Sequence, residues 1–151
     1  MRSSTMDKAA IVDYLHTHIP ISQAMGVEVL EQSETAITLS APFPPNINHQ
    51  GTVFGGSIAS VATLAAWTMI YVRLKAEKLE GDLVVQRSNL EYLLPMRDAF
   101  TARCELDEQA WQRFLGMFRR RHKGRLHMLS EVHCAQVLTC RLEGDFVVTA
   151  A

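Results

Sequence analysis

Residues 51–72 have the sequence GTVFGGSIASVATLAAWTMIYV, which contains no charged side chain. Its length is close to the ~20 residues that a membrane-spanning helix needs. Its glycines, serines and threonines make it too polar and too small-sided for a typical span, and no second apolar segment follows. A helix that is apolar or small on every side is instead expected to be buried on all sides inside a soluble fold.

The segments before this helix predict a short surface helix and a β-hairpin. Apolar positions at helical spacing over residues 6–18 predict the first helix, and Pro20 is expected to stop it. Strands are expected over residues 26–30 and 36–41, because apolar and polar side chains alternate in the second of them. Residues 42–51 contain three prolines. Because proline lacks a backbone donor and fixes φ, we expect a loop that delivers the chain to the helix.

The segments after the start of the helix indicate an antiparallel sheet. The helix is expected to begin at about Phe54 or Gly55 and to end at Leu79, and only its last turns, charged after Val72, should meet water. The further elements that we expect are a turn at Gly81-Asp82, strands over 83–94, 100–106, 126–133 and 137–149, and a helix capped by Asp107 that buries Trp111, Phe114, Leu115 and Phe118. Gly144-Asp145 should interrupt the last strand as a bulge or tight bend.

This order of elements predicts an α+β protein in which an antiparallel β-sheet wraps around a long central α-helix. The chain is 48% hydrophobic and 21% charged over 151 residues. These values fall in the range of one ordinary globular domain, so a single domain over residues 1–151 is expected.

Net charge and cysteine usage narrow the partners. A formal net charge of -1 gives no global reason to expect nucleic acid or an anionic membrane. Residues 1–7 carry Arg2 but no apolar core of a secretory signal, so a cytoplasmic location is expected. The three cysteines, Cys104, Cys134 and Cys140, are expected to be buried and reduced, without the pairing that zinc needs. We expect neither a metal nor a cofactor.

The glycine-led start of the helix is the stretch that indicates chemistry. The first N–H groups of a helix have no internal partner, and glycine lets a ligand approach the backbone closely. The N–H groups near Gly55, Gly56 and Ser57 are therefore suited to stabilising the oxyanion that forms when a thioester is attacked. The stretch lacks the Gly-Lys-Ser/Thr ending of a phosphate-binding loop. The alternative is that the paired glycines only let the helix pack against a strand.

The sequence Asn48-x-x-Gly51-Thr52-x-x-Gly55-Gly56, followed by a helix of small residues, resembles the motif of the hotdog-fold acyl-CoA thioesterases. The chain looks more closely like the thioesterase domain that follows an acetyltransferase domain in YiiD-type proteins. The residues that carry this resemblance are Phe54-Gly55-Gly56-Ser57, Trp67, Asp82, Gln86-Arg87-Ser88 and Tyr92-x-x-Pro95. The resemblance covers nearly the whole chain. It implies the hotdog fold, a coenzyme A thioester as substrate, and a homodimer or dimer of dimers with each site between one subunit's helix and its neighbour's strands. It also implies that Asn48 orients substrate or water and that a backbone N–H near Gly56 holds the thioester oxygen.

One departure leaves the catalytic base open. Hotdog thioesterases often place Asp or Glu on this helix, but the corresponding residue is Thr63, and no acid occurs from Gly51 to Ala76. Threonine orients water but is a poor base, so the base is His49 or a strand carboxylate such as Glu91. The candidate site residues are Asn48, His49, Gly56, Ser57 and Thr63 for catalysis, and Gly51, Thr52, Phe54, Gly55, Arg87, Ser88, Glu91 and Tyr92 for substrate binding.

Several alternatives stay open. The absence of an acid from the helix is consistent with a module that binds acyl thioesters without hydrolysing them. A hydratase or dehydratase of the same fold is a weaker alternative. Attack by Ser57 would replace direct attack by water. Arg87 and Glu91 are expected to share a strand face and to form a surface or interface pair. The basic run over residues 119–125 is expected to be a solvated connector, or else to bind coenzyme A phosphates.

Overall fold

The computed structural model describes residues 6–151. The first five residues, on which the expectation about a secretory signal partly rests, lie outside the described part. The elements, in chain order, are α1 (Lys8–His18), α2 (Pro20–Ala24), β1 (Glu28–Gln32), β2 (Ala36–Ala41), the 3-10 turn η1 (Pro44–Asn46), α3 (Gly55–Ala76), β3 (Gly81–Tyr92), β4 (Phe100–Glu105), α4 (Glu108–Arg121), β5 (Lys123–Cys134) and β6 (Val137–Ala150).

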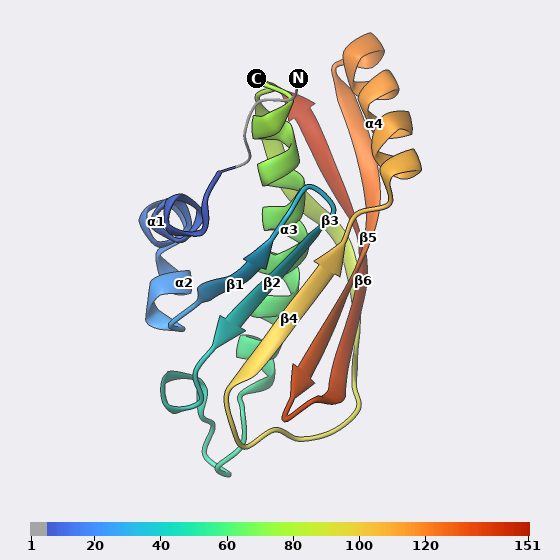
Figure 1. The fold of residues 1–151 in the computed structure, drawn as a ribbon. Helices are drawn as coiled ribbons and strands as arrows, with labels where there is room; N and C mark the ends of the chain where they lie inside the picture. Colours follow the sequence, from blue (N-terminus) through green and yellow to red (C-terminus); the bar gives the residue numbers. More distant parts are fainter. Residues whose placement is uncertain (1–5) are drawn as a thin grey trace.

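The six strands form one antiparallel sheet in the order β1-β2-β4-β5-β6-β3, and α3 runs along one face of it (Figure 1). The first strand after the helix therefore pairs with the last strand of the chain and forms an edge of the sheet. This arrangement is the α+β hotdog fold, as the sequence predicted. We call the face of the sheet that is turned away from α3 the outer face.

The central helix is buried because its side chains are apolar or small nearly all round. Val61, Ala65 and Met69 are among its fully buried residues. By length and composition α3 passes as a membrane span, but 67% of its most apolar window is buried inside the protein. Covered in this way by the sheet and the other helices, α3 forms the centre of the hydrophobic core.

Helices α1 and α4, which flank the sheet, have aspartate caps, of which the one at Asp107 was predicted. Asp7 accepts a hydrogen bond from the N–H of Ala10 at 2.8 Å, and Asp107 accepts one from Gln109 at 3.3 Å. Pro20 ends α1 as predicted and also opens α2, since proline is tolerated in a first helical turn. The four predicted residues of α4, Trp111, Phe114, Leu115 and Phe118, are all buried. The three cysteines are free and buried.

Two predicted interruptions of the strands are wrong. Gly81 and Asp82 lie inside β3 rather than in a turn, and β6 continues without a break through Gly144. The irregularity is in the neighbouring strand, where β3 bulges between Val85 and Arg87. A Cβ on Gly144 would lie 2.5 Å from the carbonyl oxygen of Arg87. Glycine is needed there because the bulged strand approaches it closely.

The prediction that the last turns of α3 meet water is wrong for Arg73, which is fully buried. Its Nη1 donates to the carbonyl oxygen of Glu34 at 2.6 Å, and its Nη2 pairs with Glu108 at 2.8 Å. The guanidinium also lies 5.1 Å from the centre of the Trp111 ring. Arg73 therefore joins α3 to α4 and to the β1–β2 turn, and these contacts offset the cost of burying its charge.

Candidate functional site

Asn46 and its neighbours fix the loop that leads into α3. The side-chain amide of Asn46 donates to the carbonyl oxygens of Met25 at 2.9 Å and Pro42 at 2.7 Å. Its backbone carbonyl oxygen accepts from the N–H of Phe54 at 2.7 Å. Phe54, the residue immediately before α3, is therefore linked through the buried Asn46 to Met25, which follows α2, and to Pro42, which follows β2.

Asn48 organises the tip of the same loop. Its Oδ1 accepts from the backbone N–H of Gln50 at 2.8 Å and of Thr52 at 3.1 Å, and its Nδ2 donates to Oγ1 of Thr52 at 2.7 Å. Gly51 has a φ of 79°, which glycine adopts without strain. These contacts give Asn48 a structural task, and its predicted contact with substrate or water stays a prediction. His49 is exposed at this tip and makes no hydrogen bond within residues 6–151.

The first turn of α3 offers two free backbone donors. Phe54 caps the helix without a side-chain bond, and the N–H of Ser57 already donates to the carbonyl oxygen of Phe54 at 3.0 Å. The N–H groups of Gly55 and Gly56 have no partner in the part of the chain that the structure describes. They precede the first intrahelical bond and lie at the positive end of the helix dipole. This pair is the candidate oxyanion hole.

Two aromatic rings border these donors. The ring of Phe54 lies over Gly56, where a Cβ would come within 2.3 Å of it. The hydroxyl of Tyr92, at the end of β3, donates to the carbonyl oxygen of Gly55 at 3.2 Å. Burial raises the pKa of the Tyr92 phenol, with a smaller contribution from Cys140, so the neutral donor form is retained. The end of β3 is thus tied to the start of the helix.

A cavity of about 360 Å³ lies between α2, α3 and β3, and its first lining residues on α3, Ala59 and Ser60, come one helical turn after the glycines. We call it the α3 cavity, and its lining residues are Ile19, Ile21, Met25, Ala59, Ser60, Thr63, Leu64, Trp67, Ser88 and Leu90. The hydroxyls of Ser60, Thr63 and Ser88 make no hydrogen bond among the described residues, so they are available to a ligand or water. The structure therefore brings two predicted residues, Thr63 and Ser88, to the same apolar pocket.

Ser57 is predicted for catalysis, and the structure places it in the first turn of α3. Its side chain is buried, and it is not among the residues that line the α3 cavity. Leu64, two helical turns later on the same face, does line the cavity. Attack by the Ser57 hydroxyl therefore stays a prediction.

The alternation of β3 separates its predicted site residues. Ser88 and Leu90 line the α3 cavity, so Arg87 and Glu91 project toward the outer face. The expected pair between Arg87 and Glu91 is absent within the described chain. Arg87 instead bonds Glu143 at 3.1 Å and Asp145 at 3.2 Å.

His127 joins this cluster on the outer face, 2.9 Å from Asp145 and 3.1 Å from Glu143. Hydrogen bonds from Arg87 lower the pKa of the Glu143 carboxyl, and those from His127 lower the pKa of Asp145. Within one chain, Arg87 and Glu91 therefore lie across the sheet from the α3 cavity.

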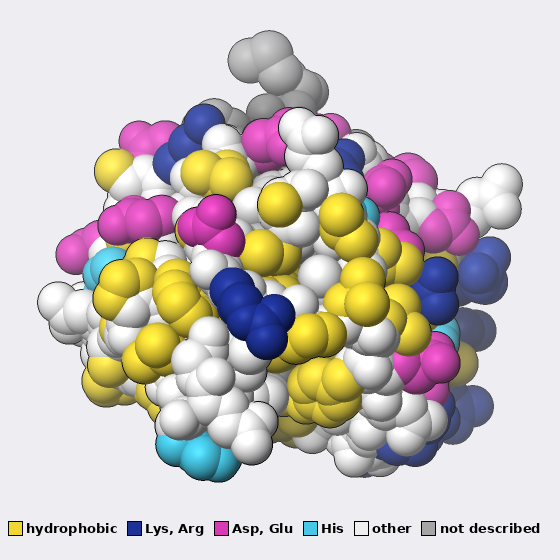
Figure 2. All heavy atoms as spheres, turned by 90° about the horizontal axis from the view of Figure 1, so that it is seen from below, with side chains coloured by type: hydrophobic (Ala, Val, Ile, Leu, Met, Phe, Trp, Pro, Cys, Tyr) yellow, Lys and Arg dark blue, Asp and Glu magenta, His cyan; other side chains and the backbone are white. Residues whose placement is uncertain are grey.

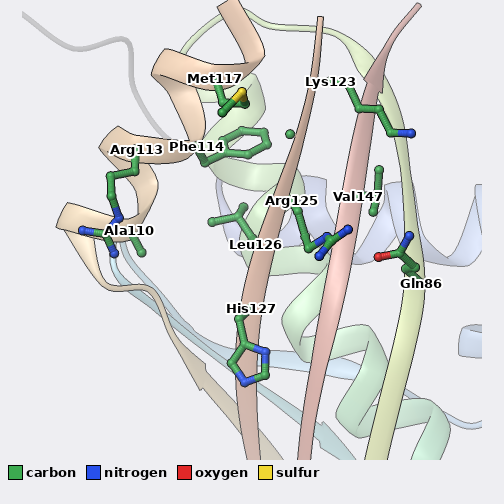
Figure 3. Close-up of a pocket in the computed structure, with 11 residues that line it drawn as sticks. Gln86, Ala110, Arg113, Phe114, Met117, Lys123, Arg125, Leu126, His127 and Val147 are labelled. Atoms are coloured by element: carbon green, nitrogen blue, oxygen red, sulfur yellow. The ribbon is translucent and has the colours of Figure 1, made fainter. Parts of the chain in front are cut away.

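A larger cavity of about 550 Å³ lies on the outer face, beside α4 and away from the glycine turn. Figure 3 shows Arg113 on the helix side of it and Lys123 and Arg125 on the strand side, with Phe114 and Leu126 between them. The basic run divides here between the end of α4 and the start of β5 rather than forming one connector. Arg119 pairs with Glu77 at 3.5 Å. We call this second hollow the α4 cavity.

The sequence missed part of the α3 cavity wall. Ser60 and Trp67 follow Gly56 at spacings of four and eleven, which place them on one helix face, so this signal was present. Ile19, which precedes α2, and Ile21, which lies in it, are distant in sequence from α3 and carried no detectable signal for the site. No group of three metal-binding side chains occurs among residues 6–151.

Comparison with known proteins agrees with this fold. The model of a family described as putative thioesterase (yiiD_Cterm) matches residues 8–150. A solved structure from Chlorobaculum tepidum, of unknown function, is 27% identical with a TM-score of 0.90, covering 95% of this chain and 94% of that one. A putative thioesterase from Shewanella oneidensis is 25% identical with a TM-score of 0.85, covering 94% and 96%. A thioesterase from Haemophilus influenzae, 16% identical with a TM-score of 0.75 over 99% and 94% of the two chains, shares the fold.

Proposed function

This chain belongs to the putative thioesterase (yiiD_Cterm) family, and on that premise we propose that it hydrolyses acyl thioesters of coenzyme A or an acyl-carrier protein. The observation that carries the proposal is the pair of unpartnered N–H groups at Gly55 and Gly56, one helical turn before the first residues of α3 that line an apolar cavity. A thioester carbonyl at these donors has its oxygen at the helix terminus and its acyl chain in the α3 cavity.

The chemistry follows from where charge develops. Water adds to the thioester carbon and loses a proton to a base, and the carbonyl oxygen becomes an oxyanion. The two N–H groups and the helix dipole stabilise that oxyanion. When it collapses, the carbon–sulfur bond breaks, the thiolate leaves and takes up a proton, and a carboxylic acid remains. One oxyanion donor contributes about 10²–10³-fold to turnover in well-studied hydrolases.

The attacking water is proposed to lie against the hydroxyls of Ser60 and Thr63. Both lie in the α3 cavity on the same face as Gly56 and lack other partners among the described residues. His49 is the candidate base that we favour, since it belongs to the loop that leads to the helix start and its side chain is exposed there. Glu91 projects toward the outer face, away from the α3 cavity.

Release of thiol from a panel of acyl-CoA esters tests the proposal. Hydrolysis by the wild-type chain, with turnover reduced by His49→Gln and by Thr63→Val, supports it. Glu91→Gln separates the two candidate bases. Undiminished turnover in all three variants would contradict these assignments, whereas absence of thiol release from every ester would contradict hydrolysis itself.

A non-catalytic binding module is the second candidate, favoured by the absence of any carboxylate among the residues that line the α3 cavity. The same assay separates it from the enzyme when binding of acyl-CoA is measured in parallel. Tight binding without thiol release supports the module. The hydratase alternative gains no support from this site, since the cavity lining holds no histidine and no acid.

We propose that the active form is a homodimer joined through β3. This strand is an edge of the sheet, yet Val84, Val85 and Tyr92 are 57%, 42% and 54% exposed. Figure 2, which looks onto the end of the molecule where α3 begins, shows hydrophobic side chains gathered at the surface there. A long apolar edge favours pairing with another strand. Light scattering after gel filtration should give twice the 16.9 kDa chain mass, and Val84→Lys should give monomers.

A further inference from the structure

Trp67 forms one end of the α3 cavity and is held there by a hydrogen bond. Its indole Nε1 donates to the carbonyl oxygen of Leu83 in β3 at 3.0 Å. At the other end, the Tyr92 hydroxyl bonds the carbonyl oxygen of Gly55. These two contacts join β3 to α3 on either side of the cavity, so the space between them has a defined length.

A stack of aromatic rings supports Trp67 from behind. The Trp67 ring lies 5.2 Å from the ring of Tyr71 with 12° between their planes, and Tyr71 lies 4.4 Å from Tyr14 of α1. His18 extends the stack at 4.1 Å from Tyr14. Each ring restricts the rotation of the next, and stacked pairs contribute about 0.5–1.5 kcal/mol beyond the area they bury. The indole is therefore a fixed wall, unlike the small residues that line the cavity nearer the helix start.

The distance from the glycine turn to Trp67 can be compared with the length of an acyl chain. Gly56 and Trp67 are eleven positions apart, so α3 rises about 16 Å between them. Van der Waals contact with the indole takes about 4 Å of that distance. An extended chain advances about 1.2 Å per bond. The remaining space holds a chain of roughly eight to ten carbons when its carbonyl lies at the glycine turn.

We propose that Trp67 ends the acyl-chain site and limits the substrate to medium-length acyl groups. The inference rests on the proposed function, because it places the thioester carbonyl at Gly55 and Gly56. It adds a specificity residue and a substrate class to that site. The other way out of the cavity passes Ile21 of α2, which is 59% exposed, and a chain that leaves there would not depend on Trp67.

The test measures kcat/KM for saturated acyl-CoA esters from four to sixteen carbons. The wild-type chain should prefer eight to ten carbons and lose about tenfold or more beyond twelve, since a misfitting methylene costs roughly tenfold or more in a tight pocket. Trp67→Ala should move the preference to longer chains, and Trp67→Leu, which leaves a better-filled core, should move it less. Trp67→Phe keeps a ring without the N–H and should stay near wild type. Ile21→Ala is the matched control for the second exit.

Several outcomes would overturn the proposal. A wild-type profile without chain-length preference, an unchanged profile in a folded Trp67→Ala variant, or a shift in Ile21→Ala alone would each contradict it. If no ester is hydrolysed, the proposed function fails first. Dissociation constants for the same esters then test the role of Trp67 separately from hydrolysis. A cavity that ends at Trp67 should still bind esters of eight to ten carbons more tightly than esters of sixteen.

Discussion

The two halves of α3 differ in how their side chains are packed and bonded. The first half, from Gly55 to Leu64, is made largely of small residues, borders a cavity, and presents hydroxyls and N–H groups without partners among the described residues. The second half holds larger buried side chains and includes Arg73, which is bonded to Glu34 and Glu108 in other elements of the fold. The difference shows how one helix is anchored at its C-terminal half so that its N-terminal half can stay open for a ligand.

Of the substitutions considered, Arg73→Met in the C-terminal half of α3 should lower the free energy of unfolding most. The substitution removes the ion pair with Glu108, the bond to Glu34 and the contact with Trp111. The free energy of unfolding should fall by about 3 kcal/mol, since removing one partner of a buried pair is strongly destabilising. Chemical denaturation measures this. Arg119→Gln, at a mostly exposed pair, should change stability by less than about 1 kcal/mol.

At temperatures where Arg73→Met remains folded, its kcat/KM should equal that of the wild-type chain. A specific loss of turnover without a loss of stability would show that the two halves are not separate in function.

Gly56→Ala, in the N-terminal half of α3, should have the opposite effect: a loss of activity with little loss of stability. The new Cβ would face the Phe54 ring and the approach to the backbone donors. We expect kcat/KM to fall about tenfold while the free energy of unfolding changes by less than about 1 kcal/mol, because the Phe54 ring is exposed and can move. The double variant Phe54→Ala/Gly56→Ala separates the two causes. Full recovery of activity in it would assign the loss to the ring rather than to the blocked donors.

The sequence predicted the elements of α3 and α4 well because local signals determine them. Uncharged small residues indicated the buried helix, and Asp107 with its apolar stripe indicated α4. Arg73 was misplaced because its partners, Glu34 and Glu108, are 39 and 35 residues away, and no local pattern identifies them.

The features of the candidate site also divide into those that local sequence determines and those that long-range packing determines. The glycine turn is a local motif and was found. The faces of Arg87 and Glu91 depend on a bulge in β3, and the Ile19–Ile21 wall depends on packing of α2, so neither was visible in the sequence.

Asn48 tests whether the loop before α3 belongs to the fold or to the chemistry. Asn48→Asp keeps the acceptor for the N–H groups of Gln50 and Thr52, whereas Asn48→Ala removes it. We expect Asn48→Ala to cost about 1 kcal/mol of stability and Asn48→Asp less than that. If the side-chain amide also contacts substrate or water, kcat/KM falls in both variants. Equal activity of Asn48→Asp and wild type would restrict Asn48 to shaping the loop.

The smallest effect on stability is expected from ionisation of Cys104, which is buried in the hydrophobic core. Burial raises the pKa of this thiol to about 12, so it should not react with a thiol reagent at pH 8 in the folded chain. The raised pKa means that the unfolded chain releases this proton first. The contribution to stability should therefore decline as pH rises from about 9 toward 12. Rapid labelling of native protein, located at Cys104 by mass spectrometry, would show that the core is open.

The central claim is that backbone N–H groups at the start of α3 hold the thioester oxygen, and Gly55→Pro tests it most directly. Proline fits the first helical position, and Phe54 already has the extended backbone, ψ 131°, that a following proline requires. Gly55→Ala is the control, because it keeps the N–H and its Cβ meets Tyr92 at an ordinary 3.7 Å. We predict that kcat/KM falls about 10²–10³-fold in Gly55→Pro and stays near wild type in Gly55→Ala. A folded Gly55→Pro variant with wild-type kcat/KM would contradict the account.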